Sequence, residues 1–149
     1  MPRYIRHGLC QNFPCNYLMM ELCEETVLDY LVRNPAALGQ KCIQMLSCIE
    51  ALHKFGVIHR DIKPTNFMMR GDDVVIIDFG THKEYRDKNG NHIPEKNTLS
   101  LQGTVLFASI NALEKKELSR RDDLECLGFS ILYLNNGKQL PWHDGTEEV

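Results

Sequence analysis

Residues 57–80 constrain this chain most, because two groups of chemically capable side chains lie there at fixed spacing. The first group is His59-Arg60-Asp61, followed by Asn66. The second group is Asp78-Phe79-Gly80, which directly follows the apolar run 74–77. A short apolar run between polar turns predicts a buried strand, and the glycine lets the chain leave that strand without a side-chain clash. We expect the two carboxylates and the amide to converge on one pocket.

These residue types suit phosphoryl transfer, which depends more on positioning and charge neutralisation than on covalent catalysis. Asp61 would accept the proton of a substrate hydroxyl, and Lys63 would place a compact positive charge near the transferred phosphate. Asn66 and Asp78 offer the hard oxygen ligands that Mg²⁺ prefers. Together the two groups match the sequence signatures of protein kinases. The alternative is two buried strands followed by acidic loops without a catalytic role.

The apolar run at 17–22 predicts another buried strand, just before the first helix. In a kinase, a strand in this place leads into the hinge that binds adenine. Met20 would then guard the back of the pocket, and the backbone groups of Leu22 and Cys23 would pair with the base. Asp29 would lie within reach of the ribose. The alternative is a core strand followed by a helix start, with Asp29 solvated.

Apolar residues spaced three and four apart predict a core helix over 35–53. Asn34 can cap this helix and Pro35 suits its first turn, while Gly56 lies where a left-handed turn would end it. A shorter helix is expected over 26–32.

A second core helix is expected over 121–134, packed against the first. Its apolar face would consist of Leu124, Leu127, Gly128, Ile131 and Leu134. Asp123, near its start, is a candidate for a buried role in which its carboxylate binds backbone N–H groups of the loop that carries Asp61.

The stretch from 81 to 106 predicts a long loop, marked by Asn89-Gly90 and Pro94. Ordered loops of this length are uncommon unless they are functional. The functional interpretation is a substrate-facing activation segment, and the alternative is a mobile surface loop. Thr104 is placed where its hydroxyl could contact Asp61 and Lys63.

Composition narrows the classes of partner. A chain of 149 residues suits one domain, and a net charge of −3 gives no reason to expect binding to nucleic acid. No apolar run approaches the ~20 residues of a membrane helix, and the N-terminus has no apolar signal core. The six cysteines form no Cys-x-x-Cys pair, which favours reduced thiols over a zinc site. We expect a cytoplasmic or nuclear monomer.

Several motifs together resemble the casein kinase 1 superfamily, including its tau-tubulin kinase-like branch. Residues 59–67 look like the catalytic loop of that family. Gly103-Thr104 followed by Ala108-Ser109-Ile110-Asn111 resembles its replacement for the Ala-Pro-Glu of most kinases. The start of its central helix resembles residues 119–125, and Leu140-Pro141-Trp142 also fits.

The resemblance implies an α+β protein kinase-like fold whose C-terminal lobe is mainly helical with a few short strands. It implies phosphorylation of Ser or Thr in protein substrates, with ATP and Mg²⁺ as cofactors and Met68 as the floor of the adenine pocket. Residues 1–21 would be the last strands of the small lobe, residues 22–29 the hinge, and residues 30–149 a large lobe that is incomplete at its C-terminal end.

The chain also departs from this family. It contains no Gly-x-Gly-x-x-Gly loop and no Val-Ala-x-Lys-like strand before residue 17, so most of the N-terminal lobe is expected to be missing. Family members that favour pre-phosphorylated substrates have basic residues at positions that match Leu99 and Leu106, and leucines cannot bind a phosphate. Two hypotheses remain: a Ser/Thr kinase with an intact catalytic loop, or a catalytically dead fragment that acts as a binding or decoy protein.

Overall fold

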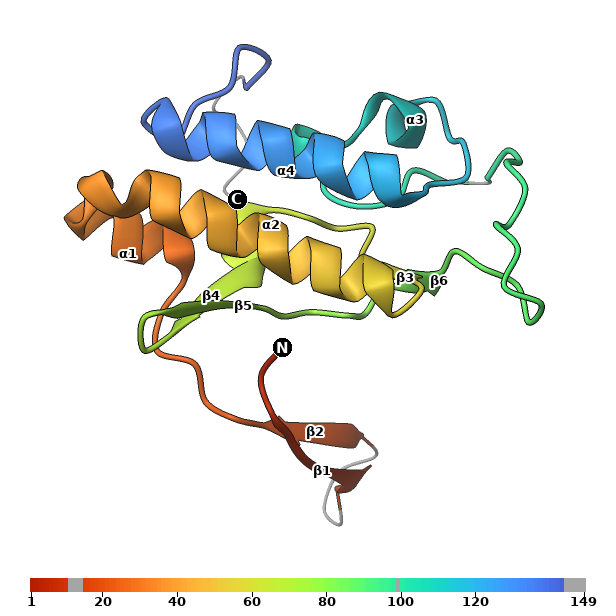
Figure 1. Ribbon diagram of the computed structural model, residues 1–149, viewed down its shortest axis with the longest axis horizontal. Coiled ribbons are helices and arrows are strands. Elements are labelled where there is room, and N and C mark those ends of the chain that lie inside the picture. Colours follow the sequence, from red (N-terminus) through yellow and green to blue (C-terminus); the bar gives the residue numbers. More distant parts are fainter. Residues whose placement is uncertain (11–14, 99, 144–149) are drawn as a thin grey trace.

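Two helices, α2 (Leu38–Lys54) and α4 (Arg120–Asn135), lie side by side in the computed structural model, which describes residues 1–10, 15–98 and 100–143 (Figure 1). The short helix α1 (Val27–Arg33) precedes α2. The antiparallel hairpin of β4 (Phe67–Arg70) and β5 (Asp73–Ile76) packs against α1 and α2. The mixture of helices and strands agrees with the expected α+β class.

The remaining elements are short. Two further antiparallel pairs join β1 (Tyr4–Leu9) to β2 (Asn16–Met20) and β3 (Val57–Ile58) to β6 (Lys83–Glu84). Single turns of 3₁₀-helix span Pro35–Ala37 (η1), Pro64–Asn66 (η2) and Val105–Phe107 (η3), and α3 spans Ile110–Leu113. None of the helices in the described ranges is long and apolar enough to cross a bilayer.

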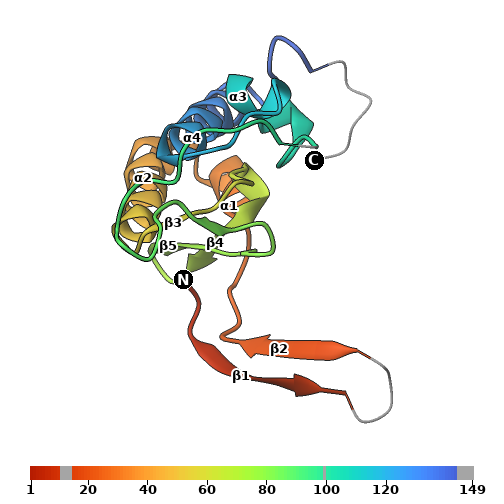
Figure 2. The ribbon, with the colours of Figure 1, turned by 90° about the vertical axis from the view of Figure 1, so that its right-hand side faces the viewer.

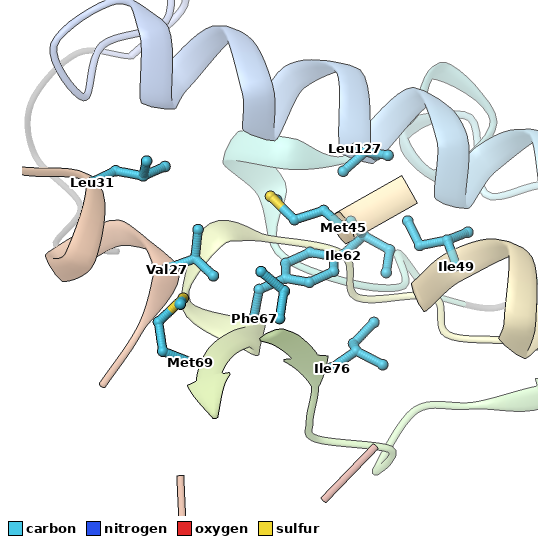
Figure 3. Packing of buried hydrophobic residues seen from close by; sticks show 10 residues of the cluster. Val27, Leu31, Met45, Ile49, Ile62, Phe67, Met69, Ile76 and Leu127 are labelled. Carbon is cyan, nitrogen blue, oxygen red and sulfur yellow. The ribbon is translucent and has the colours of Figure 1, made fainter. Parts of the chain in front are cut away.

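One apolar cluster joins α1, α2, α4 and the β4–β5 hairpin (Figure 3). Met45 and Ile49 of α2 and Phe67 of β4 are completely buried, and Leu127 of α4 closes the cluster from the other side. Fully burying such a side chain contributes about 1.5–3 kcal/mol. The cluster confirms that the two long helices pack together, and through Ile62 and Phe67 it supports the loop between β3 and β4.

The helix expected over 35–53 begins later than predicted. Pro35 opens the separate turn η1, and α2 starts at Leu38. The expected cap is wrong, because the Asn34 side chain donates to the carbonyl of Tyr30 (3.1 Å) and so completes the end of α1 instead. Gly56 adopts the left-handed conformation predicted for it, with φ of +82°.

The prediction for the buried face of α4 is correct in part, since Leu127 belongs to the core cluster and Ile131 and Leu134 pack against it. Leu124 is 45% exposed and Gly128 is exposed, whereas Leu127 is buried. The buried face contains polar residues that an apolar count misses, and its members are Asp122, Asp123, Leu127, Ser130 and Tyr133. A capping box between Ser119 and Asp122 begins the helix.

The β1–β2 hairpin projects away from the rest of the structure (Figure 2). All of β2 is exposed, including Leu18 at 61%, so the prediction of a buried strand is wrong for this structure. The apolar run at 17–22 does predict a strand, which spans Asn16–Met20, but within the described residues only β1 pairs with it. Both faces of the hairpin therefore keep exposed apolar side chains.

Candidate active site

Asp123 of α4 binds the backbone of the loop after β3. The Asp123 carboxylate accepts hydrogen bonds from the backbone N–H groups of His59 and Arg60, both at 2.9 Å, and contacts His53 Nε2 at 2.8 Å. Arg60 has a left-handed backbone (φ +69°). Asp123 is only 1% exposed, so its charge depends on these partners. The predicted contact between Asp123 and this loop is present.

Asp61 is the centre of the loop. Its Oδ1 accepts a hydrogen bond from the Thr104 hydroxyl at 2.8 Å, as expected. Its Oδ2 lies 3.9 Å from Lys63 Nζ, so Thr104 meets Lys63 only through this carboxylate. Asn66 donates from Nδ2 to the backbone carbonyl of Asp61 at 2.8 Å. The spacing of these residues in the sequence therefore places three polar side chains around one carboxylate.

Gly103 brings Thr104 up to Asp61. Its φ is +87°, and a Cβ built at this position would lie 2.7 Å from the carbonyl oxygen of Arg60. That distance is shorter than side-chain carbons tolerate, and the conformation is one that L-residues rarely adopt. Only glycine fits this approach of the activation segment to the catalytic loop.

Asp78 is fixed beside Asn66 by the peptide that precedes it. The Ile77 N–H donates to the Asn66 carbonyl at 2.9 Å. His59 Nε2 contacts the Ile77 carbonyl at 2.9 Å, and because a carbonyl can only accept, this nitrogen carries the proton. Asp78 itself is left-handed (φ +62°) and exposed. This backbone contact joins the segment that carries Asn66 to the segment that carries Asp78.

Gly80 lies in the turn after β5, where the sequence predicts that it avoids a side-chain clash. The left-handed residue is Asp78, and Gly80 does not have a positive φ. The Gly80 N–H donates to Asp78 Oδ1 at 3.3 Å, and a Cβ on Gly80 would meet the same oxygen at 3.3 Å. The glycine gives this carboxylate room rather than reversing the chain.

Asn66 and Asp78 have the donor atoms that a magnesium ion needs. The Asn66 amide nitrogen is used by Asp61, and its Oδ1 accepts no hydrogen bond from the described residues. The Asp78 carboxylate is exposed and accepts only the long bond from Gly80. Free, hard oxygens of this kind fit Mg²⁺, which usually takes one or two protein carboxylates together with phosphate oxygens and waters.

The first part of the long loop is tied to the catalytic loop. The Thr81 hydroxyl donates to the His59 carbonyl at 3.0 Å, and the Arg60 guanidinium donates to the Thr81 carbonyl. Tyr85 is 3% exposed and its hydroxyl donates to the His53 carbonyl at 2.8 Å. Residues 81–85 are therefore bound in place, which does not fit a freely mobile surface loop.

The segment that follows the long loop is anchored by Asp122. Its carboxylate accepts hydrogen bonds from the Ser109 hydroxyl (2.8 Å), the Asn111 amide (2.9 Å) and the Ser119 backbone (2.7 Å). Asp122 is 1% exposed. It holds the Ala108–Asn111 motif to the start of α4, and nothing in its spacing pointed to this role.

The residues expected around adenine are not enclosed. Met20 is 43% exposed on β2, and the hairpin that carries it projects away from β4, which carries Met68 (Figure 2). Leu22 is 93% exposed, and partial burial raises the pKa of the Cys23 thiol. Met68 is half-buried and lies between Phe67 and Met69, which are both buried. The structure does not bring Met20 and Met68 together.

Asp29 is neither free nor simply solvated. Thr26 begins α1, and its hydroxyl oxygen accepts from the Asp29 N–H at 3.0 Å while donating to the Asp29 carboxylate at 2.7 Å. This reciprocal contact stabilises the first turn of the helix. The carboxylate remains on the surface and can accept a further hydrogen bond.

Three residues of the site were missed at the level of the sequence. The sequence pattern does not identify His53, which lies in the last turn of α2. It does not identify Asp122 either, which directly precedes the predicted Asp123 in α4. His59 stood inside the recognised motif, but its hydrogen bond to the residue before Asp78 depends on long-range folding. The family model described as Protein kinase domain matches residues 7–149, which include every residue of this site.

Proposed function

Because the chain belongs to the protein kinase domain family, we propose that its site serves the transfer of the γ-phosphate of ATP to Ser and Thr hydroxyls of proteins. One observation carries the proposal. The Asp61 carboxylate is held by Thr104 beside Lys63, and the Ile77 peptide sets Asp78 next to Asn66. These contacts support a proton acceptor beside a cation, with the two proposed magnesium ligands on segments that are joined by a backbone hydrogen bond.

In the proposed step, the substrate hydroxyl oxygen bonds to the γ-phosphorus, the bond from that phosphorus to the bridging oxygen breaks, and ADP leaves. Asp61 takes the hydroxyl proton. Its Oδ2 suits this role, because its contacts to Asn66 Nδ2 (3.5 Å) and Lys63 Nζ (3.9 Å) are long. Lys63 would balance charge on the transferred phosphate.

Asn66 and Asp78 would hold Mg²⁺, which neutralises phosphate charge when it is bound with ATP. We propose that residues 22–29 form the hinge that binds the adenine base of ATP. The backbone groups of Leu22 and Cys23 make no hydrogen bonds within the described chain, while Glu24 binds the carbonyl of Met69 at 3.0 Å. Met68 would form the floor of the adenine site, Met20 its back and Asp29 its ribose edge.

The choice of Ser and Thr, and of a casein kinase 1-like branch, rests on the resemblance of the motifs. Pre-phosphorylated substrates are not part of the proposal. Leu106 is 6% exposed and packs with Phe107, Tyr133 and Leu140, so it presents neither charge nor access to a phosphate. Leu99, the other matching position, lies outside the described residues.

A binding or decoy role is the second candidate, and one observation favours it. The chain has no Gly-x-Gly-x-x-Gly, and Met20 and Leu22 lie exposed instead of closing a nucleotide pocket. Because positioning of the phosphates supplies most of this catalysis, we expect the 149-residue chain by itself to show little or no turnover.

The test compares this chain with a version extended at both ends by the small-lobe strands and final helices of a related kinase. Both are assayed with Mg-ATP and with Ser, Thr and Tyr peptides. We expect the extended version to phosphorylate Ser or Thr peptides and to lose this activity in the Asp61→Asn variant. Asp73→Asn is the control, since that side chain is 70% exposed and belongs to no part of the site.

Absence of transfer by the extended version to every Ser and Thr peptide, together with no effect of Asp61→Asn, would reject the kinase proposal. Transfer to Tyr peptides alone would retain the kinase and reject its proposed substrate class. Clear Mg-ATP-dependent turnover by the unextended chain would contradict the expectation that it is inactive.

A further inference from the structure

A groove of about 840 Å³ lies between α2 and the start of α4, and its lining residues do not belong to the core cluster that contains Met45 and Leu127. Its apolar lining comes from Ile43, Leu46 and Leu124, which are 68%, 48% and 45% exposed. These side chains are separate from the buried stripe of α2, so they contribute nothing to the core. Contiguous exposed apolar surface with a polar rim is typical of protein interaction sites.

One side of the groove carries two arginines that share a single aromatic ring. The guanidinium carbon of Arg120 lies 4.7 Å from the ring centroid of Tyr85, and that of Arg86 lies 5.3 Å from it. Neither arginine has a carboxylate within 4.0 Å among the described residues, and both are exposed. Stacking on the ring holds both charges at the rim and leaves their donors free.

The other cations of the groove are already neutralised. Arg121 pairs with Glu95 at 2.8 Å, and Lys54 pairs with Glu50 at 2.7 Å. The free positive charge is therefore confined to Arg86 and Arg120, in a chain whose net charge is −3. Charge complementarity therefore favours a partner that places carboxylates against Arg86 and Arg120.

We propose that this groove binds an acidic amphipathic helix of a partner protein, with leucine or phenylalanine side chains in the groove and carboxylates on the two arginines. Apolar residues three and four positions apart lie on one side of such a helix, which matches an apolar lining with a basic edge. Nucleic acid fits less well, because the phosphate backbone is usually bound by several cations and the centre of this groove is apolar.

The proposal does not depend on catalysis, and binding tests it directly. The probe is a fluorescent peptide of about four helical turns, with leucines spaced three and four residues apart and glutamates between them. We expect saturable binding to the full chain by fluorescence anisotropy. Ile43→Lys and Arg120→Glu should each weaken it about tenfold or more, the effect of losing one important contact.

The controls match each change elsewhere on the surface. Arg6→Glu removes another arginine that stacks on a tyrosine, 5.8 Å from the ring of Tyr17 on the projecting hairpin. Val32→Lys places a lysine at another exposed apolar position, 62% exposed on α1. Both should leave the affinity within about twofold, which is ~0.4 kcal/mol. Far-UV circular dichroism checks that every variant is folded.

Three results would overturn the proposal. The first is equal binding of a peptide with lysines in place of the glutamates, and the second is equal binding of a glutamate-rich peptide without leucines. The third is self-association of the chain that Ile43→Lys abolishes in sedimentation, because that result would assign the groove to a second copy.

Discussion

Removing the Asp123 carboxylate should destabilise the chain strongly. Its side chain is 2% exposed and accepts two backbone N–H groups of the catalytic loop, besides contacting His53. Asp123→Ala leaves those donors buried without a partner. Breaking such a buried ionic contact costs about 3–5 kcal/mol. The total free energy of unfolding of a small domain is ~5–15 kcal/mol, so the variant should unfold at a much lower denaturant concentration.

Urea titration followed by far-UV circular dichroism measures this loss. With a denaturant slope near 2 kcal/mol/M, the midpoint should fall by ~2 M. The urea midpoint of Asp123→Asn should lie between those of the unchanged chain and Asp123→Ala. The asparagine keeps one acceptor oxygen but turns an amide N–H₂ toward a backbone donor. Asp73→Ala, whose carboxylate is 70% exposed, should change stability by less than ~0.5 kcal/mol. A loss below ~0.5 kcal/mol for Asp123→Ala would refute the reasoning.

Three further predictions use other features. Gly103→Ala should lower the free energy of unfolding, measured in urea, by about 1–3 kcal/mol, because its φ is strained and a Cβ would lie only 2.7 Å from a carbonyl oxygen. Gly128→Ala should raise it by roughly 0.5–1 kcal/mol, because a Cβ there meets nothing within 4 Å. Lys41→Met should raise the unfolding free energy, since this lysine is 1% exposed and has no carboxylate within 4.0 Å in the described chain. The Asp72 carbonyl, which accepts from Lys41 at 2.7 Å, would keep its hydrogen bond from Gln44 at 3.1 Å, and a loss above ~1 kcal/mol would contradict the prediction. Burial raises the pKa of Cys126 to about 12, so alkylation near pH ~8 should label exposed Cys15 first and Cys126 last. For the same reason, the free energy of unfolding should fall as the pH rises from the ordinary thiol pKa toward 12.

Local spacing was sufficient to predict that the loop with Asp61 follows a short strand and that Asp78 follows another. Asp61, Asn66 and Asp78 are close in the sequence and lie at the ends of short strands, so few arrangements of the chain can separate them. The role of Asp123 could also be predicted, because an acid early in a core helix needs donors when it is buried. These residues are positioned by contacts that short-range patterns encode.

Long-range contacts account for what the sequence could not predict. The count of apolar residues places Leu124 in the core because it omits Asp122 and Asp123, whose buried carboxylates bind groups of distant segments. The burial of Lys41 is a similar case, since its ammonium reaches the carbonyl of Asp72 at 2.7 Å and the ring of Tyr30. Polar groups become core residues only when distant segments supply their hydrogen bonds.

The contacts of the catalytic loop also separate two parts of the proposed activity. Asp61 is held by the activation segment and the loop itself, and that loop is held by α4. None of these contacts involves the projecting hairpin, whose strand β2 packs only on β1 within the described residues. Proton acceptance and magnesium binding can therefore be organised without that hairpin, whereas enclosure of adenine by Met20 cannot. It follows that loss of Met20 should weaken nucleotide affinity in the extended version while leaving the stability of the catalytic loop unchanged.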